Sequence, residues 1–278
     1  MKTAKTILSA SGILIVAFAL FLSSCTGKSG KGTESGGLAP GESDQSKDQV
    51  IKEISEYPLP TAFEVTNLLI KAGAGYILDL SNPVVSVDKY INIKSKALNL
   101  GIYGADLSYA ATYNQSQETM QFLKVTSQLI DELQISSGFN QTLVDKVEKN
   151  LGNVDSLINI ISDSFYDTYR HLKDNHQDEV SVLVMAGSWI EAIYITSQIS
   201  ILSKNNQELV KIIAQQRPSL SKLMEIMEPV RENNMITDVY NDLKSIKNIF
   251  DNAGETFTAS QLDELNKEIE TLRNKIVA

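Results

Sequence analysis

The chain has 278 residues, with 25 basic and 34 acidic side chains and a formal net charge of −9. Nucleic acids and anionic lipid headgroups need clustered positive charge, so this acidic balance argues against binding either of them. The single cysteine, Cys25, leaves no partner for an internal disulfide. No cofactor motif stands out, and we expect no cofactor.

The N-terminal stretch has the layout of an export signal. Lys2 and Lys5 precede an apolar run from Ile7 to Leu22, and small residues follow before Cys25. The run of about 16 residues is shorter than the ~20 that span a bilayer as a helix. A plain signal peptide with a chance cysteine is one interpretation, and a lipid-anchoring signal is the other.

The segment Leu22-Ser23-Ser24-Cys25 resembles the lipobox of bacterial lipoproteins. The resemblance implies a lipoprotein signal peptide over residues 1–24, cleavage before Cys25, and attachment of acyl chains such as palmitate to that residue. It makes the membrane a partner through lipidated Cys25. Thr26 rather than Asp follows the cysteine, which by the same resemblance favours the outer membrane, facing the periplasm.

A flexible linker follows the anchor. Residues 25–46 are rich in Gly, Ser and charge, with almost nothing to bury. A coil of ~21 residues has a reach of about 25 Å. Loss of Lys2 and Lys5 with the signal peptide leaves 23 basic against 34 acidic residues, a net charge of −11.

Residues 47–278 are predicted to form an all-α domain, a multi-helix bundle of about eight to ten helices. Apolar residues recur at helical spacing, Gly and Pro separate the runs, and no run is strong enough to predict a sheet. A short lead-in helix is expected at 49–57, and the helices of the bundle are expected at 61–71, 87–112, 117–135, 140–151, 153–172, 180–203, 205–214, 219–227, 230–250 and 258–276. Asn153 can cap the helix that it begins, Asn205 with Glu208 can form a capping box, and Thr258 with Gln261 caps the last helix.

The second half of the 87–112 segment carries two faces. Small residues share one face, where a neighbouring helix can approach closely: Gly101, Ala105, Ser108 and Thr112. An aromatic wall with one carboxylate occupies the other: Tyr103, Asp106, Tyr109 and Tyr113. The wall is either ordinary amphipathic packing, with hydroxyls reaching water, or part of a ligand pocket.

The segment 180–203 is the most apolar part of the mature chain. It contains one charged residue, Glu191, and the only tryptophan, Trp189. A helix that is apolar all round is buried, so we expect the central helix of the bundle. A membrane span is disfavoured because polar residues lie near its middle. Glu191 is either paired in the core or lines a ligand pocket with Trp189 or Tyr194.

Both histidines lie near residue 172, among acidic side chains. On a helix, His171 shares a face with Asp167 and Asp174, and imidazole and carboxylate groups are usual metal ligands. His176 points elsewhere, because five residues separate it from His171. A solvated turn between helices is the alternative to a metal site.

These features predict a non-catalytic envelope lipoprotein whose helical domain binds a protein partner or a small ligand. The chain has no Gly-x-Ser-x-Gly turn, its cysteine is assigned to lipid, and it has two histidines. An envelope hydrolase using paired carboxylates is one alternative. A metal-binding lipoprotein using the His171 region is another.

Overall fold

The computed structural model describes residues 62–135, 139–204 and 206–278. The predicted signal peptide, Cys25, the linker and the helix expected at 49–57 lie outside these ranges. Those expectations therefore stay predictions. All contacts below belong to the helical domain.

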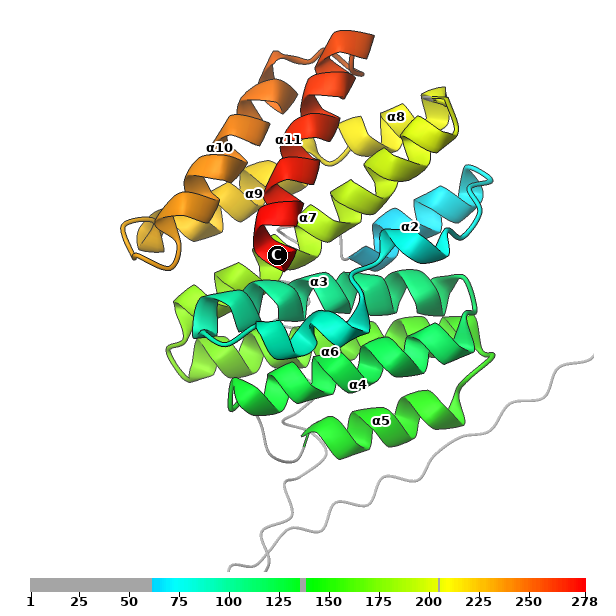
Figure 1. Ribbon diagram of the computed structural model, residues 1–278, viewed down its shortest axis with the longest axis vertical. Coiled ribbons are helices and arrows are strands. Elements are labelled where there is room, and N and C mark those ends of the chain that lie inside the picture. Colours follow the sequence, from blue (N-terminus) through cyan, green and yellow to red (C-terminus); the bar gives the residue numbers. More distant parts are fainter. Residues whose placement is uncertain (1–61, 136–138, 205) are drawn as a thin grey trace, which may run out of the picture. The chain divides into compact units, whose positions relative to one another are not determined.

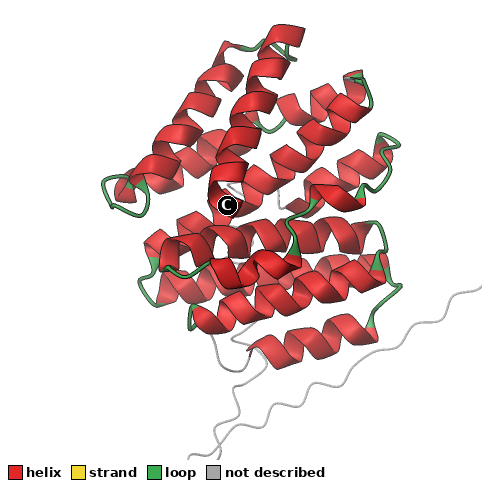
Figure 2. Ribbon diagram, viewed as in Figure 1, coloured by secondary structure: helices red, strands yellow, loops and turns green. Residues whose placement is uncertain are grey.

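The described part of the chain is all-α, as predicted, and Figure 2 shows helices and loops there without a strand. It contains ten α-helices and three short 3-10 helices. The α-helices are α2 (Ala62–Lys71), α3 (Ile93–Thr112), α4 (Ser116–Glu132), α5 (Phe139–Lys149), α6 (Val154–Asp174), α7 (Asp178–Leu202), α8 (Gln207–Ala214), α9 (Arg217–Met227), α10 (Thr237–Asn252) and α11 (Ala259–Val277). The 3-10 helices are η1 (Leu78–Leu80), η2 (Val84–Lys89) and η3 (Glu228–Val230).

Helices α3 and α7 form the central pair, and two glycines let them approach closely. A Cβ atom on Gly101 would lie 2.0 Å from the carbonyl oxygen of Val184. A Cβ atom on Gly187 would lie 2.0 Å from the carbonyl oxygen of Leu98. The predicted close approach at the small-residue face of α3 is therefore confirmed at Gly101, and Gly187 is its counterpart on α7.

The other helices pack around this pair. Helix α4 lies against α3, α2 contacts both central helices, and α11 packs mainly on α7. Figure 1 shows α3, α4 and α5 in succession, and α5 and α6 extend the packing from α4 back to α3 and α7. Helices α8 and α9 cover other parts of α7, while α10 packs on α9 and α11. The two central helices thus position every candidate site described below.

Helix α7 confirms the prediction of a central, buried helix. Among the described helices it alone is long and apolar enough to cross a bilayer, but 89% of that apolar window is buried inside the domain. Its large side chains contact helices on several sides, which accounts for an apolar sequence without a polar face.

Side-chain caps explain where several helices begin. Asn153 accepts a hydrogen bond from Ser156 N and starts α6, as predicted. Thr258 and Gln261 form the predicted capping box at the start of α11. At α8 the cap is Asn206, which accepts from Glu208 N, whereas the sequence had indicated Asn205.

Two helices begin later than predicted. The helix expected from Val87 starts at Ile93, because Asn92 caps it by accepting a hydrogen bond from Ser95 N at 2.8 Å. The helix expected from Val230 starts at Thr237, after a turn in which Asn233 accepts from Met235 N at 2.9 Å. In both cases an asparagine side chain competes with the helical hydrogen-bond pattern.

Candidate functional site

Three charged side chains from three helices meet in the core, and we call them the acid cluster: Asp106 of α3, Glu191 of α7 and Arg273 of α11. Both carboxylates are 0% exposed and Arg273 is 7% exposed. The guanidinium of Arg273 binds Glu191 through two hydrogen bonds of 3.0 Å, from Nε to Oε2 and from Nη2 to Oε1. Such a two-point pair is the strongest arrangement open to Arg and a carboxylate.

The segment between α2 and α3 closes the acid cluster. The backbone N–H of Asn82 donates to Asp106 Oδ2 at 3.0 Å, and Arg273 Nη2 donates to the Leu80 carbonyl at 3.4 Å. The Arg273 guanidinium also lies 4.6 Å from the ring centre of Tyr194, a cation–π contact. The cluster therefore links this segment to the C-terminal helix.

Asparagine and tyrosine side chains extend this link to the end of the chain. Asn82 Nδ2 donates to Tyr90 Oη at 3.0 Å and to Asn99 Oδ1 at 3.3 Å. Asn99 Nδ2 donates to the Ile276 carbonyl at 3.2 Å, and Tyr90 Oη to the Val277 carbonyl at 3.4 Å. The last turn of α11 is thereby held against the start of α3.

Burial dominates the electrostatics of the acid cluster. It raises the pKa of Asp106 well above its usual range, and the Glu191 charge raises it further, against opposing effects of the Asn82 N–H and Arg273. Burial also raises the pKa of Glu191, but there Arg273 favours the ionised form both by charge and by hydrogen bonding. Arg273 therefore favours ionised Glu191 more directly than ionised Asp106.

The tyrosines of the predicted wall hold the segment that follows α2. Tyr109 Oη accepts a hydrogen bond from Ile77 N at 2.9 Å, and Tyr113 Oη donates to the Ala74 carbonyl at 2.8 Å. The ring of Tyr76 lies on both, with ring centres 4.7 Å and 5.7 Å away. Burial raises the pKa of Tyr109 to about 12, so its hydroxyl is neutral at ordinary pH.

The six residues predicted to bind a ligand fall into separate groups of contacts in the core. Asp106 and Glu191 meet in the acid cluster, whereas Tyr109 and Tyr113 stack with Tyr76. Tyr103 Oη donates to the Pro83 carbonyl at 2.9 Å, and Trp189 packs 6.1 Å from Phe250, between ring centres. None of the six is among the residues that line the pocket described next, and ligand binding by them stays a prediction.

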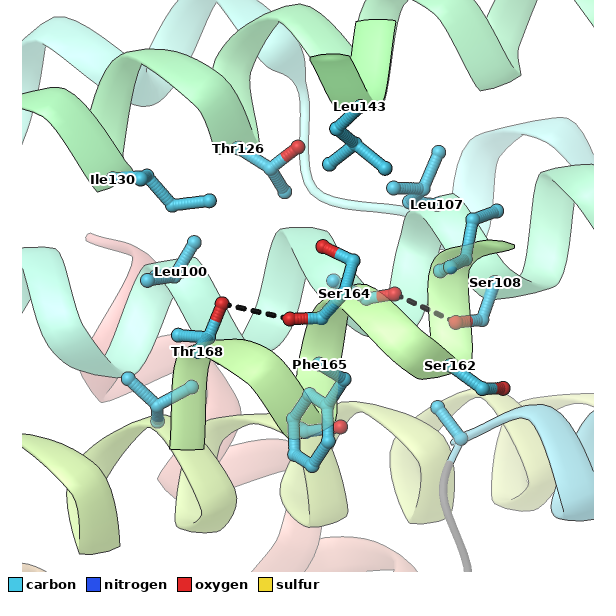
Figure 3. Close-up of a pocket in the computed structure, with 15 residues that line it drawn as sticks. Leu100, Leu107, Ser108, Thr126, Ile130, Leu143, Ser162, Ser164, Phe165 and Thr168 are labelled. Atoms are coloured by element: carbon cyan, nitrogen blue, oxygen red, sulfur yellow. Dashed lines mark hydrogen bonds between the residues drawn. The ribbon is translucent and has the colours of Figure 1, made fainter. Parts of the chain in front are cut away.

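A partly open pocket lies on another side of α3, among helices α3 to α7, and we call it the α3–α7 pocket. Its cavity volume is ≈ 60 Å³. Figure 3 shows aliphatic and aromatic side chains turned toward it from several helices. The main apolar side chains are Leu100, Leu107, Ile130, Leu143, Phe165 and Val184.

Three of the six hydroxyl groups that line the pocket donate hydrogen bonds within their own helices. Ser108 Oγ donates to the Gly104 carbonyl at 2.9 Å, and Thr168 Oγ1 donates to the Ser164 carbonyl at 2.9 Å (Figure 3). Thr126 Oγ1 donates to the Phe122 carbonyl at 2.8 Å. No Asp, Glu, Lys, Arg or His is among the described residues that line the pocket.

The residues near His171 have other partners. Asp167 pairs with Arg170 at 2.6 Å, and the His171 ring lies 3.3 Å from the Asn175 side-chain amide. Asp174 is exposed at the end of α6. Within the described ranges, no group of three His, Cys, Asp or Glu side chains could hold a metal ion.

Sequence reasoning identified Glu191 as a buried carboxylate in need of a partner but missed Arg273 and the pocket. Arg273 follows Ile269 by four residues and so lies on the apolar stripe of the last helix, which was the available signal. The arrangement offers a buried, closed ion cluster and an uncharged apolar pocket. No family model, no curated protein and no solved structure matches the chain.

Proposed function

We propose that this chain is a lipid-anchored, non-catalytic protein of the cell envelope whose helical domain binds a small apolar ligand. The observation that carries the binding role is the α3–α7 pocket, which opens into the core among apolar side chains and without a charged lining residue in the described chain. The lipobox-like segment ending at Cys25 supports the anchor.

The lining selects the chemical class of the ligand. Carboxylates and phosphates are bound best by cations, and the described lining has none, while Ser108, Thr126 and Thr168 already donate to backbone carbonyls. Their oxygens retain lone pairs, so a ligand hydroxyl can still donate to them. An uncharged hydrocarbon chain with at most a hydroxyl group fits this lining.

The size of the pocket agrees with a short hydrocarbon segment. One water molecule needs about 10–15 Å³ on this measure, so ≈ 60 Å³ admits a few methylene-sized groups. The opening lets the rest of a longer ligand extend outward. The lining offers hydroxyls but no base to activate them, which supports a binding role rather than hydrolysis.

The acid cluster lends no support to a hydrolase. Paired carboxylates that cleave glycosides flank a substrate, whereas Asp106 and Glu191 are both 0% exposed and Glu191 is occupied by Arg273. The cluster is therefore better placed to hold helices together than to reach a substrate.

Gly104 allows a direct test of ligand binding. It lines the pocket, and a Cβ atom added to it would meet nothing within 4 Å. In Gly104→Leu the new side chain occupies the space that a ligand needs, whereas Gly104→Ala fills little of it. Both changes favour the helix over glycine, so both variants should fold.

Fluorescence of phenylnaphthylamine, an uncharged apolar probe, provides the measurement, with decanol as a competitor. We expect wild type and Gly104→Ala to bind the probe and release it to decanol. Gly104→Leu should bind it about ten-fold more weakly or worse, a loss of about 1.4 kcal/mol. Equal binding by all three proteins, or no binding by wild type, would contradict the proposed ligand site.

A further inference from the structure

The acid cluster has an excess of one negative charge when all of its groups are ionised. Asp106 and Glu191 are both fully buried, and among the described residues Arg273 is the one cation that pairs with Glu191 and acts on Asp106. An uncompensated charge in the core is costly unless the group binds a proton or gains a partner. The excess charge is removed if one of the two buried carboxyl groups binds a proton.

The hydrogen bonds show which oxygen is available for a proton. Both Glu191 oxygens accept from Arg273, and Asp106 Oδ2 accepts from Asn82 N. Asp106 Oδ1 is buried without a hydrogen-bond partner, and after burial the charge of Glu191 is the strongest effect that opposes ionisation of Asp106. Ser81 lies near Asp106, but its hydroxyl makes no hydrogen bond of good geometry.

We propose that Asp106 binds a proton on Oδ1 at neutral pH and donates it to Glu191. The acid cluster is then a neutral set of carboxylic acid, carboxylate and guanidinium, and a buried proton-binding site between α3, α7 and α11. This assignment satisfies the remaining oxygen of Asp106 and removes the excess charge with groups already in place.

The surroundings supply no competing charge. Burial raises the pKa of Tyr103, and burial likewise raises the pKa of Tyr109 to about 12, so both hydroxyls stay neutral. Glu270, on α11, is exposed. The further titratable groups that face the cluster from the segment after α2, the η2–α3 junction and α7 are Tyr76, Tyr90 and Tyr194.

Binding of this proton makes the folding stability of the domain depend on pH. Unfolded Asp titrates near pH 4, and burial raises the pKa of Asp106 above that in the folded protein. Its contribution to stability is therefore complete below about pH 4 and is lost as the pH rises through the folded-state value. Loss of the proton adds a negative charge at Asp106. The segment 80–83 lies beside this charge, held by the Asn82 N–H and by Arg273.

The isosteric variant Asp106→Asn tests the proposal, because its amide mimics the protonated acid. We expect the folding constant of wild type relative to Asp106→Asn to fall about ten-fold per pH unit above about pH 4, until the folded-state pKa. Asp88→Asn, which removes an exposed carboxylate, should follow wild type. Parallel curves for wild type and Asp106→Asn up to about pH 9 would overturn the proposal.

Two further measurements do not require Asp106→Asn to fold. Infrared spectra of wild type with isotope-labelled aspartate should show the carbonyl band of a protonated acid at neutral pH, and its absence would overturn the proposal. In Glu191→Gln the neighbouring charge is gone and Arg273 remains, so the ten-fold slope should disappear, and an unchanged slope would also count against the proposal.

Discussion

At the scale of single residues, Arg273 decides whether the centre of the domain holds together. It is the cation that pairs with buried Glu191, its charge also favours ionised Asp106, and it donates to the Leu80 carbonyl. Replacing a buried ion pair with apolar groups is often neutral, but removing one partner strands the other charge. Truncation of Arg273 alone belongs to the second case, because it leaves Glu191 buried without its cation.

Arg273→Ala should lower the free energy of unfolding by about 3–5 kcal/mol, because Glu191 is left buried without its cation. Lys275→Ala provides the matched control on the same helix. The Lys275 side chain is 53% exposed and pairs with Asp242 at 2.7 Å, so its removal should cost less than about 1 kcal/mol. Urea unfolding followed by circular dichroism measures both, and similar losses in the two variants would contradict this view of the core.

At the scale of helices, the crossing of α3 and α7 organises the domain. The backbone of each helix approaches the other at a glycine. A methyl group at either glycine would lie closer to a carbonyl oxygen than van der Waals contact allows. This crossing sets the register in which Asp106 of α3 comes close to Glu191 of α7. A shift of either helix would affect both the acid cluster and the pocket.

Gly187→Ala should therefore destabilise the domain by at least about 1–3 kcal/mol, the usual cost of overpacking a core. Gly104→Ala is the control on α3: no atom lies within 4 Å of its added Cβ, and alanine favours the helix by about 0.5–1 kcal/mol over glycine. Thermal unfolding of the two variants gives opposite shifts if the crossing is rigid. A neutral Gly187→Ala would mean that the helices separate at little cost.

The sequence predicted the presence of the helices better than where some of them start and how they contact one another. Apolar periodicity and the caps at Asn153 and Thr258 were sufficient for the helices that they begin. The starts of α3 and α10 were missed because Asn92 and Asn233 form local hydrogen bonds that periodicity does not report. In both segments the chain before the true start forms a 3-10 helix and a turn instead of an α-helix.

The candidate sites were harder to predict because they depend on how helices cross. Glu191 and Arg273 are separated by 82 positions, and no local pattern pairs them. The pocket was missed because α6 contributes Ser and Thr side chains to it, and hydroxyl side chains in a sequence usually indicate a solvent-exposed face. Thr168, for example, is buried and bonded to its own helix.

At the scale of the whole molecule, anchor and domain have separate tasks in the proposed function. The domain contains its own apolar core, and its one helix capable of spanning a bilayer among those described is occupied by packing with its neighbours. We therefore propose that membrane attachment depends on Cys25. The net charge of −9 gives no electrostatic attraction to anionic lipid that could replace it.

Cys25→Ala tests this division of tasks in a bacterial host. Buried acyl chains contribute ~0.8 kcal/mol per methylene, and several chains on one residue make a durable anchor. We expect wild type to incorporate labelled palmitate and to remain in the membrane fraction after a salt wash, and Cys25→Ala to do neither. Ser24→Ala keeps a small residue before the cysteine and should behave as wild type. If Cys25→Ala stayed as firmly bound as wild type, some surface of the helical domain would have to provide the attachment.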